Sequence, residues 1–235
     1  MTSTTPGFER RLEDLAGRLA EQGRRVTLLF EQAAEVVFAR DAGRAREVVD
    51  RDDEVDRVDV EIERAAVGLL TDATRDGAAL APEQLRRVLT IVKINNELER
   101  TADAATMIAA EAPVLAAIGR ALPSALLVLT NSVAGILRDV TQSFERNDAR
   151  LAKIVLDSED TVEAFKSQLI RDAERAIAAG TMPVDFAFAV YELVSQCERI
   201  ADHATNIAEQ VIYAATGAIV RHTDAGWIEL PKPSG

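Results

Sequence analysis

The sequence is poor in the residues that interrupt or cross-link a protein chain. Its 235 residues include one cysteine, twelve glycines, seven prolines and only 4% aromatic residues. A single cysteine, Cys197, excludes an intramolecular disulfide and fits a reducing cytoplasm. Alanine, leucine, valine, glutamate and arginine dominate instead, and 48% of the residues are hydrophobic. This composition favours a helical globular protein of one or two domains.

Basic residues and long apolar runs are also scarce. The chain has 27 Lys and Arg against 39 Asp and Glu, for a formal charge of −12. Nucleic acids and anionic membranes reward clustered Lys and Arg, so this balance argues against binding to either. We find no run of about 18 apolar residues that would span a bilayer. Residues 1–6 lack the basic region and apolar core of a signal peptide.

Apolar residues recur at helical spacing in six long segments. These segments cover approximately residues 8–37, 44–74, 82–108, 126–144, 155–177 and 183–217. Short connections between six such helices predict an all-α fold of two tandem antiparallel three-helix bundles. We place the first bundle at 8–112, the second at 116–217 and a C-terminal tail at 218–235.

An internal repeat supports this division. Residues 99–110 recur 99 residues later as 198–209, with eight of twelve positions identical. Both copies begin with Glu-Arg-x-Ala-Asp, which indicates a duplication. On a helix, two carboxylates four residues apart lie about 40° apart around the axis and about 6 Å apart along it. Glu99 and Asp103 therefore share one helix face, as do Glu198 and Asp202.

The second helix of each half repeats the same acid spacing. Asp52 and Asp56 form the pair in the first half, and Glu159 and Glu163 form it in the second. The seven-residue apolar row through residues 48–69 places Asp52 at or beside a core position. Each bundle is therefore expected to offer two acid pairs on two helices that pack together.

Buried carboxylates need compensation, because an unpaired one costs several kcal/mol even after relaxation. Protons or other cations would serve, but metal ions would use all four acids of a bundle. Sites made only of oxygen ligands suit hard cations such as Mg²⁺, Ca²⁺, Mn²⁺ or oxidised iron. The predicted metal ligands are Asp52, Asp56, Glu99, Asp103, Glu159, Glu163, Glu198 and Asp202. The alternative is a solvated charged face with local ion pairs.

Signatures of enzymes are missing from the sequence. It has no glycine-rich phosphate loop, no paired histidines for hydrolytic zinc and no Glu-x-x-His pair of di-iron oxidases. Cys197 has no histidine beside it that would activate a nucleophile. His203 follows Asp202 and is either a further ligand or a hydrogen-bonded neighbour. Enzyme activity is therefore not expected.

The segment 198–209, continuing through Tyr213, Gly217 and the pair at 221–222, resembles the PhoU family of phosphate-signalling proteins, and 99–103 is its first-repeat partner. Members of that family carry two three-helix repeats, each with an acid-x-x-x-acid motif on two helices. The resemblance covers roughly 8–222. Ala102 and Ala201 replace the usual glycine, and Glu159 and Glu163 stand where aspartates are common.

In its first repeat the chain also has Met107 and Ala110 where the second has Asn206 and Glu209. The first site is therefore expected to have fewer oxygen donors around it.

The PhoU resemblance implies a cytoplasmic negative regulator of phosphate uptake and phosphate-starvation signalling. Such a protein would act as an adaptor between the ATPase subunit of a phosphate transporter and a sensor histidine kinase. It would be a homodimer and would reach the membrane only through these partners. Its cofactors would be divalent or trivalent metal ions, with iron, zinc, manganese and magnesium as candidates. Two alternatives stay open: a metal-binding helical bundle with a hydrolytic or storage role, and a structural bundle without metal.

Overall fold

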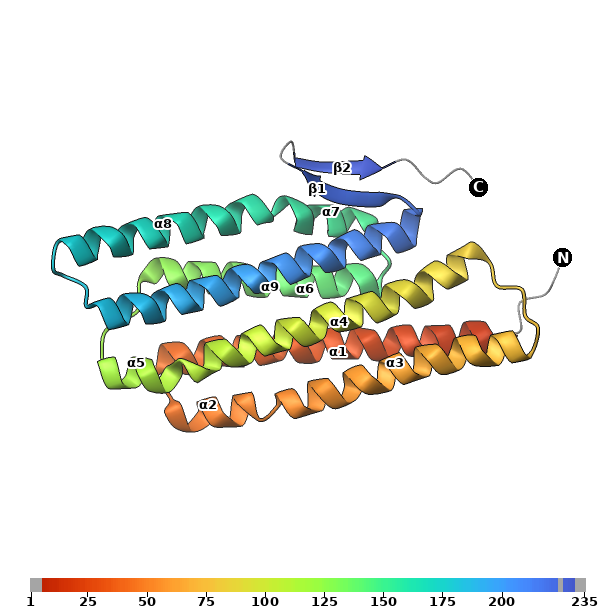
Figure 1. Cartoon of the computed structure of the whole chain (residues 1–235), viewed down its shortest axis with the longest axis horizontal. Coiled ribbons are helices and arrows are strands. Elements are labelled where there is room, and N and C mark those ends of the chain that lie inside the picture. Colours follow the sequence, from red (N-terminus) through yellow and green to blue (C-terminus); the bar gives the residue numbers. More distant parts are fainter. Residues whose placement is uncertain (1–5, 224–225, 231–235) are drawn as a thin grey trace.

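The computed structural model describes residues 6–223 and 226–230, most of which are helical (Figure 1). The elements in chain order are α1 (Pro6–Ala39), α2 (Ala42–Val49), α3 (Asp52–Arg75), α4 (Pro82–Ala110), α5 (Ala112–Ile118), α6 (Ser124–Glu145), α7 (Ala149–Asp157), α8 (Glu159–Ala178), α9 (Val184–Thr216), β1 (Ile219–Thr223) and β2 (Gly226–Leu230).

The helices form the two predicted antiparallel three-helix bundles (Figure 1). The first bundle contains α1, the α2–α3 pair and α4, and the second contains α6, the α7–α8 pair and α9. The same turn precedes α2 and α7. Arg40 and Asn147 have positive φ angles of 56° and 51°. Asp41 and Asp148 then cap the helices by accepting backbone N–H groups. Matching turns at matching positions are what an internal duplication predicts.

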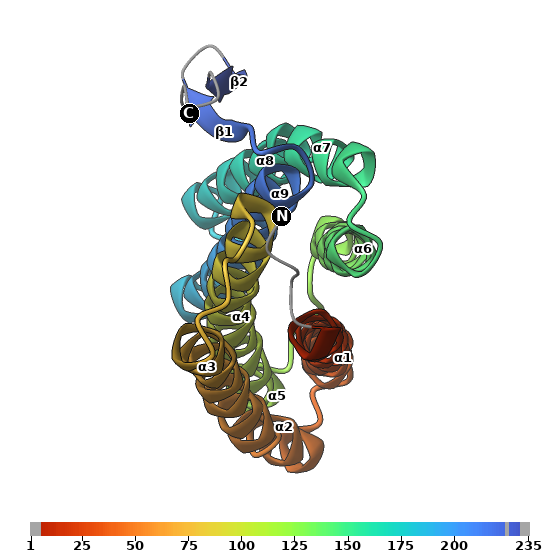
Figure 2. The ribbon, with the colours of Figure 1, turned by 90° about the vertical axis from the view of Figure 1, so that its right-hand side faces the viewer.

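The bundles pack through two pairs of helices, and each pair runs in opposite directions. α4 lies beside α9, and α1 lies beside α6 (Figures 1 and 2). Arg138 of α6 donates a 2.8 Å hydrogen bond to Glu31 of α1. A Cβ atom on Gly23 would lie 2.6 Å from the Phe144 ring, so this position needs glycine for close contact. The two repeats are thus related by an approximate two-fold axis.

Figure 2 shows two unequal layers. α3, α4, α9 and α8 lie in one layer, and α1 and α6 lie beside it, to the right in this view. We call the surface of these four helices that points away from α1 and α6 the broad face. α4 and α9 occupy its centre and carry many buried small residues, which allow helices to approach closely. The buried alanines of these two helices include Ala102, Ala104, Ala105, Ala109, Ala201, Ala204 and Ala208.

The second helix of each bundle is interrupted, which the apolar pattern does not predict. Continuous helices were expected over 44–74 and 155–177, but breaks occur at 50–51 and at Ser158. Asp50 and Ser158 keep right-handed helical backbone angles. The chain therefore bends at these points and continues in nearly the same direction (Figure 1).

The residues after α9 form a small hairpin where the sequence analysis expects a tail over 218–235. β1 packs on α9 and pairs antiparallel with β2, with Val220 opposite Glu229. Five-residue strands of this kind are marginal alone, so contact with a helix is what stabilises them. The part of the tail at 231–235 lies outside the described residues.

Among the described residues, one helical segment meets the length and composition of a membrane span, contrary to our reading of the sequence. This segment is Pro82–Ile118, which joins α4 and α5, and 44% of its most apolar window is buried inside the protein. The core helix of a folded bundle meets the same test. Its central place between the bundles explains why α4 is so apolar (Figure 2).

We expect Ala104→Leu to destabilise the protein. Ala104 is completely buried, and extra methylenes in a packed core cost about 1–3 kcal/mol. Ala110→Leu is the matched control, because Ala110 is exposed at the end of α4. Urea unfolding followed by circular dichroism gives both free energies of unfolding. Equal values for the two variants would contradict tight packing at the centre of α4.

Candidate functional site

The first carboxylate cluster forms where α3 packs against α4. Asp52 and Asp56 come from the first two turns of α3, and Glu99 and Asp103 come from α4. Burial, followed in order of effect by the charges of Asp56, Asp103 and Glu99, raises the pKa of Asp52 to about 6. All four predicted ligands of the first repeat therefore lie close enough for the charges of the other three to act on Asp52.

The break before α3 helps to place this cluster. Asp52 begins the helix, and Asp53 and Glu54 follow it in the first turn. The N-terminal end of a helix carries a partial positive charge, which favours carboxylates there. The break in the second bundle likewise places Glu159 and Asp160 in the first turn of α8. Each bend thus starts a helix at the first acid of a pair.

The first cluster has the features of an incomplete cation site. The Oδ1 atom of Asp52 is buried and has no hydrogen-bond partner among the described residues. Burial and the charges of Asp103, Asp59 and Asp56 raise the pKa of Glu99. All donors are carboxylate oxygens, which suit a hard cation. The donor chemistry of these residues therefore suits the metal that the sequence predicts.

Asp59 extends this cluster, although it is absent from the predicted ligands. Burial raises its pKa, with further contributions from Glu63 and Asp56. Asn95 of α4 donates from Nδ2 to the Asp59 carboxylate at 2.6 Å and to its backbone carbonyl at 3.0 Å. The signal that could have identified Asp59 is its place seven residues after Asp52, at the same heptad position beside the apolar row.

The second cluster forms in the same way between α8 and α9. Burial raises the pKa of Asp202 to about 6, with the charges of Glu198 and Glu159 as the next contributions. Glu163 lies one turn after Glu159 on α8. The structure therefore also brings the predicted ligands of the second repeat together.

A lysine that the sequence analysis does not consider enters this second cluster. Lys166 Nζ lies 2.5 Å from Glu198 Oε1 and 3.3 Å from Glu163 Oε2. Hydrogen bonding to Glu198 raises the pKa of Lys166 despite partial burial. Ser167 also donates a 3.2 Å hydrogen bond to Glu163. The second cluster thus contains its own cation and fits a metal ion less well than the first.

The side chains as placed do not complete a coordination shell. Within 6–223 and 226–230, no three Asp, Glu, His or Cys side chains converge closely enough to hold a metal ion. Asn206 and Glu209, expected to enrich the second site, are engaged elsewhere. Asn206 donates to Glu97 at 3.2 Å, and Glu209 accepts from Arg221 of β1. Metal binding at either cluster therefore requires rotation of the carboxylates.

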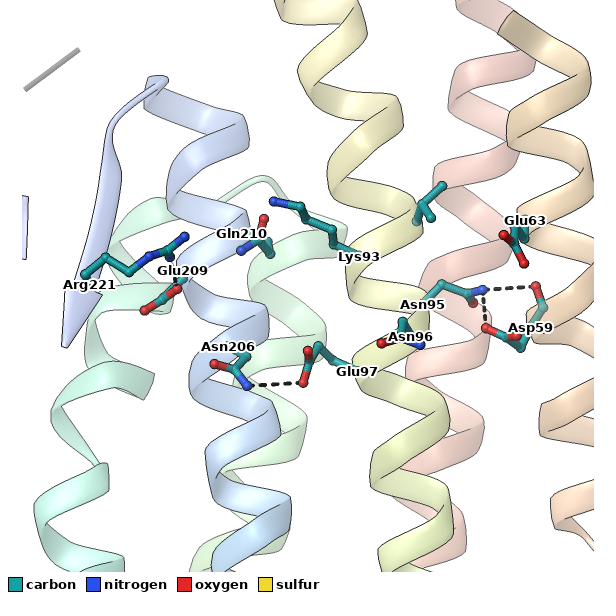
Figure 3. Close-up of a pocket in the computed structure, with 11 residues that line it drawn as sticks. Asp59, Glu63, Lys93, Asn95, Asn96, Glu97, Asn206, Glu209, Gln210 and Arg221 are labelled. Carbon is teal, nitrogen blue, oxygen red and sulfur yellow. Dashed lines mark hydrogen bonds and ion pairs between the residues drawn. The ribbon is translucent and has the colours of Figure 1, made fainter. Parts of the chain in front are cut away.

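A polar groove of about 740 Å³ crosses the broad face from α3 over α4 to α9 and β1 (Figure 3). Glu97 of α4 lines this groove, and its Oε2 atom lies 2.8 Å from His203 Nδ1 of α9. Burial favours the neutral acid, but hydrogen bonds from His203 and Asn206 outweigh it and lower the pKa of Glu97. Of the two roles expected for His203, the structure shows the hydrogen-bonded one, and this contact joins the two repeats.

Cys197 is fully buried, and burial raises the pKa of its thiol to about 12. A thiol in this state stays protonated and is a poor nucleophile. Cys197 is thus a small core residue. The side chain of His222 lies outside the described residues.

Comparison with known proteins identifies the family. A family model described as "PhoU domain" matches residues 19–112 and 126–211, which correspond to the two bundles. The chain belongs to the PhoU family. Each match spans three helical segments and contains both acid pairs of its bundle.

Two curated relatives of this PhoU-family chain share the name "phosphate-specific transport system accessory protein PhoU homolog". The protein from Zymomonas mobilis is 29% identical over 215 residues, covering 91% of this chain and 89% of the relative. The protein from Aquifex aeolicus is 31% identical over 214 residues, covering 90% and 94%. The similarity therefore extends over nearly the whole of each protein.

Solved PhoU structures share the fold. The crystal structure of PhoU from Pseudomonas aeruginosa has a TM-score of 0.83 at 26% identity, covering 89% of this chain and 99% of that one. The phosphate transport system regulatory protein PhoU from Streptococcus pneumoniae also has a TM-score of 0.83, at 19% identity, covering 91% and 99%. The two-bundle arrangement is thus a PhoU architecture.

We expect the metal-free protein to gain stability as the pH falls from about 7.5 to about 5. Asp52 and Asp202 have pKa values of about 6 in the folded protein, above the value of about 3.9 for an unfolded chain. Between these values the folded state binds more protons, so stability rises as the pH falls. One pKa unit corresponds to about 1.4 kcal/mol, and solvent screening reduces this to roughly 1 kcal/mol for each group.

Urea unfolding in the presence of a chelator measures this effect. Asp52→Asn should remove part of the pH dependence. Asp14→Asn, at an exposed aspartate of α1, should leave it unchanged. A wild-type stability that stays constant or falls over this pH range would contradict the raised pKa values.

Proposed function

We propose that this chain is a regulatory accessory protein of phosphate transport and is not an enzyme. The observation that carries the proposal is the match of both bundles to the PhoU domain, together with relatives named as phosphate-specific transport accessory proteins. The inert thiol of Cys197 and the lack of a catalytic motif in the sequence support a role in binding.

In finer detail, the proposed role is a cytoplasmic negative regulator of phosphate uptake and phosphate-starvation signalling. The protein would connect the ATPase subunit of a phosphate transporter to a sensor histidine kinase, as a homodimer that reaches the membrane only through these partners. An adaptor must bind its partners differently in each signalling state to carry information. The broad face, formed by helices from both repeats, supports this role because one partner could contact both repeats at once (Figure 2).

The proposal includes a cation at the first cluster. Asp52, Asp56, Glu99 and Asp103 would hold it. The raised pKa values of Asp52 and Glu99 and the unpartnered Asp52 oxygen support the assignment. The cation would neutralise the clustered negative charges and fix α3 against α4. A hydrolytic role for the same cluster is the second candidate, and an assay for metal-dependent phosphatase activity tests it.

Deletion of the gene tests the regulatory role. We expect phosphate-scavenging genes to be expressed in plentiful phosphate when the gene is deleted, and re-expression of the protein to restore repression. The purified protein should retain the transporter ATPase or the cytoplasmic part of the kinase in a pull-down assay. Unaltered phosphate-responsive expression together with the absence of both partners would refute the proposed role.

Chelation tests the cation. A ligand present at 100 times its dissociation constant stabilises a protein by about 2.7 kcal/mol, so removal should lower the melting temperature by about 5 °C or more. Glu99→Gln preserves side-chain shape and should abolish the response. Glu47→Gln, at an exposed glutamate of α2, is the control and should respond like wild type. A wild-type melting temperature that ignores the chelator would argue against a bound cation.

A further inference from the structure

The two carboxylate clusters differ at one matching position. In the first repeat Asp59 lies three residues after Asp56, the second acid of the α3 pair. In the second repeat Lys166 lies three residues after Glu163, the second acid of the α8 pair. A carboxylate in one repeat is thus replaced by an ammonium group in the other.

We propose that Lys166 is a built-in counter-ion that closes the second cluster to metal ions, so that this chain binds cations only at the first cluster. The statement about the first cluster rests on the proposed function above. The statement about Lys166 rests on the contacts of the second cluster alone. The two repeats, although duplicated, would then have different chemistry.

The contacts of Lys166 support this role directly. Its ammonium group bridges the two helices of the cluster, at 2.5 Å from Glu198 Oε1 on α9 and 3.3 Å from Glu163 Oε2 on α8. The side chains of Lys166 and Glu198 are only 26% and 27% exposed. Solvent and salt screen a partly buried pair less than a surface pair. A metal ion would have to displace the ammonium group or bind beside a like charge.

The first cluster has no such cation. None of its carboxylates forms a salt bridge within the described parts of the chain, and Asp59 adds a further negative charge. Burial and the charges of neighbouring acids raise the pKa values of Asp52 and Glu99. The members of this set are Asp52, Asp56, Asp59, Glu99 and Asp103. Their charges would attract a cation, opposed by the weaker effect of Arg100, whose charge lowers the pKa of Glu99.

Binding of Mn²⁺ to the purified full chain tests the proposal, with stoichiometry measured by equilibrium dialysis and elemental analysis. We expect Mn²⁺ bound to wild type to be lost in Glu99→Gln and retained in Glu198→Gln. Lys166→Met, which keeps side-chain length and removes the charge, should bind a further Mn²⁺ per chain. Adding Glu198→Gln to Lys166→Met should remove that gain.

Lys153→Met is the matched control. It removes the same charge from an exposed lysine of α7 in the same bundle, and it should leave the stoichiometry unchanged. Asp59→Lys places the ammonium group of the second repeat at the matching position of the first. It should reduce Mn²⁺ binding at the first cluster, and it provides an independent variant if Lys166→Met does not fold, as judged by circular dichroism.

The outcomes separate the two proposals. Two results would overturn the role of Lys166. One is that Glu198→Gln binds less Mn²⁺ than wild type. The other is that folded Lys166→Met binds the same number of Mn²⁺ ions as wild type. If Lys166→Met did not fold, unreduced binding in Asp59→Lys would overturn it. If wild type binds no Mn²⁺ but Lys166→Met gains a Glu198-dependent ion, the metal role of the first cluster fails and that of Lys166 stands.

Discussion

The close packing of α4 against α9 is the contact on which the rest of the structure depends. Small buried residues such as Ala104 and Ala204 allow it, and the paired side chains of Glu97 and His203 link the two helices across it. Because the helices run in opposite directions, α3 and α8 become the outer edges of one layer (Figure 2). This arrangement sets a carboxylate cluster on each side of the central pair, with the polar groove between the repeats.

Much of this could be predicted from the sequence, because it depends on regular spacing. The apolar period defined the helices, and the repeated Glu-Arg-x-Ala-Asp unit revealed the two bundles. Acids four residues apart share a helix face, so the meeting of Asp52 with Glu99 followed once the two helices packed. The breaks at Asp50 and Ser158 did not follow, because both residues keep helical angles and leave the apolar pattern intact.

The other unpredicted features depend on contacts between distant residues. The ion pair between Lys166 and Glu198 joins two helices, and in sequence Lys166 resembles an ordinary surface lysine. Glu209 looked like a possible donor for the second cluster, but Arg221 of the hairpin engages it. The hairpin itself lacks a strong alternating pattern, and contact with α9 helps to stabilise it. Local periodicity carries no information on such pairings.

The approximate two-fold relation between the repeats has a consequence for recognition. A symmetric face would offer a partner two equivalent orientations, related by half a turn. Here one edge of the broad face carries Asp59 and the other carries Lys166. The hairpin follows only α9 and adds a second difference. A partner with complementary charges would therefore distinguish the two edges and bind in a single orientation. The duplicated fold is thus asymmetric as a binding surface.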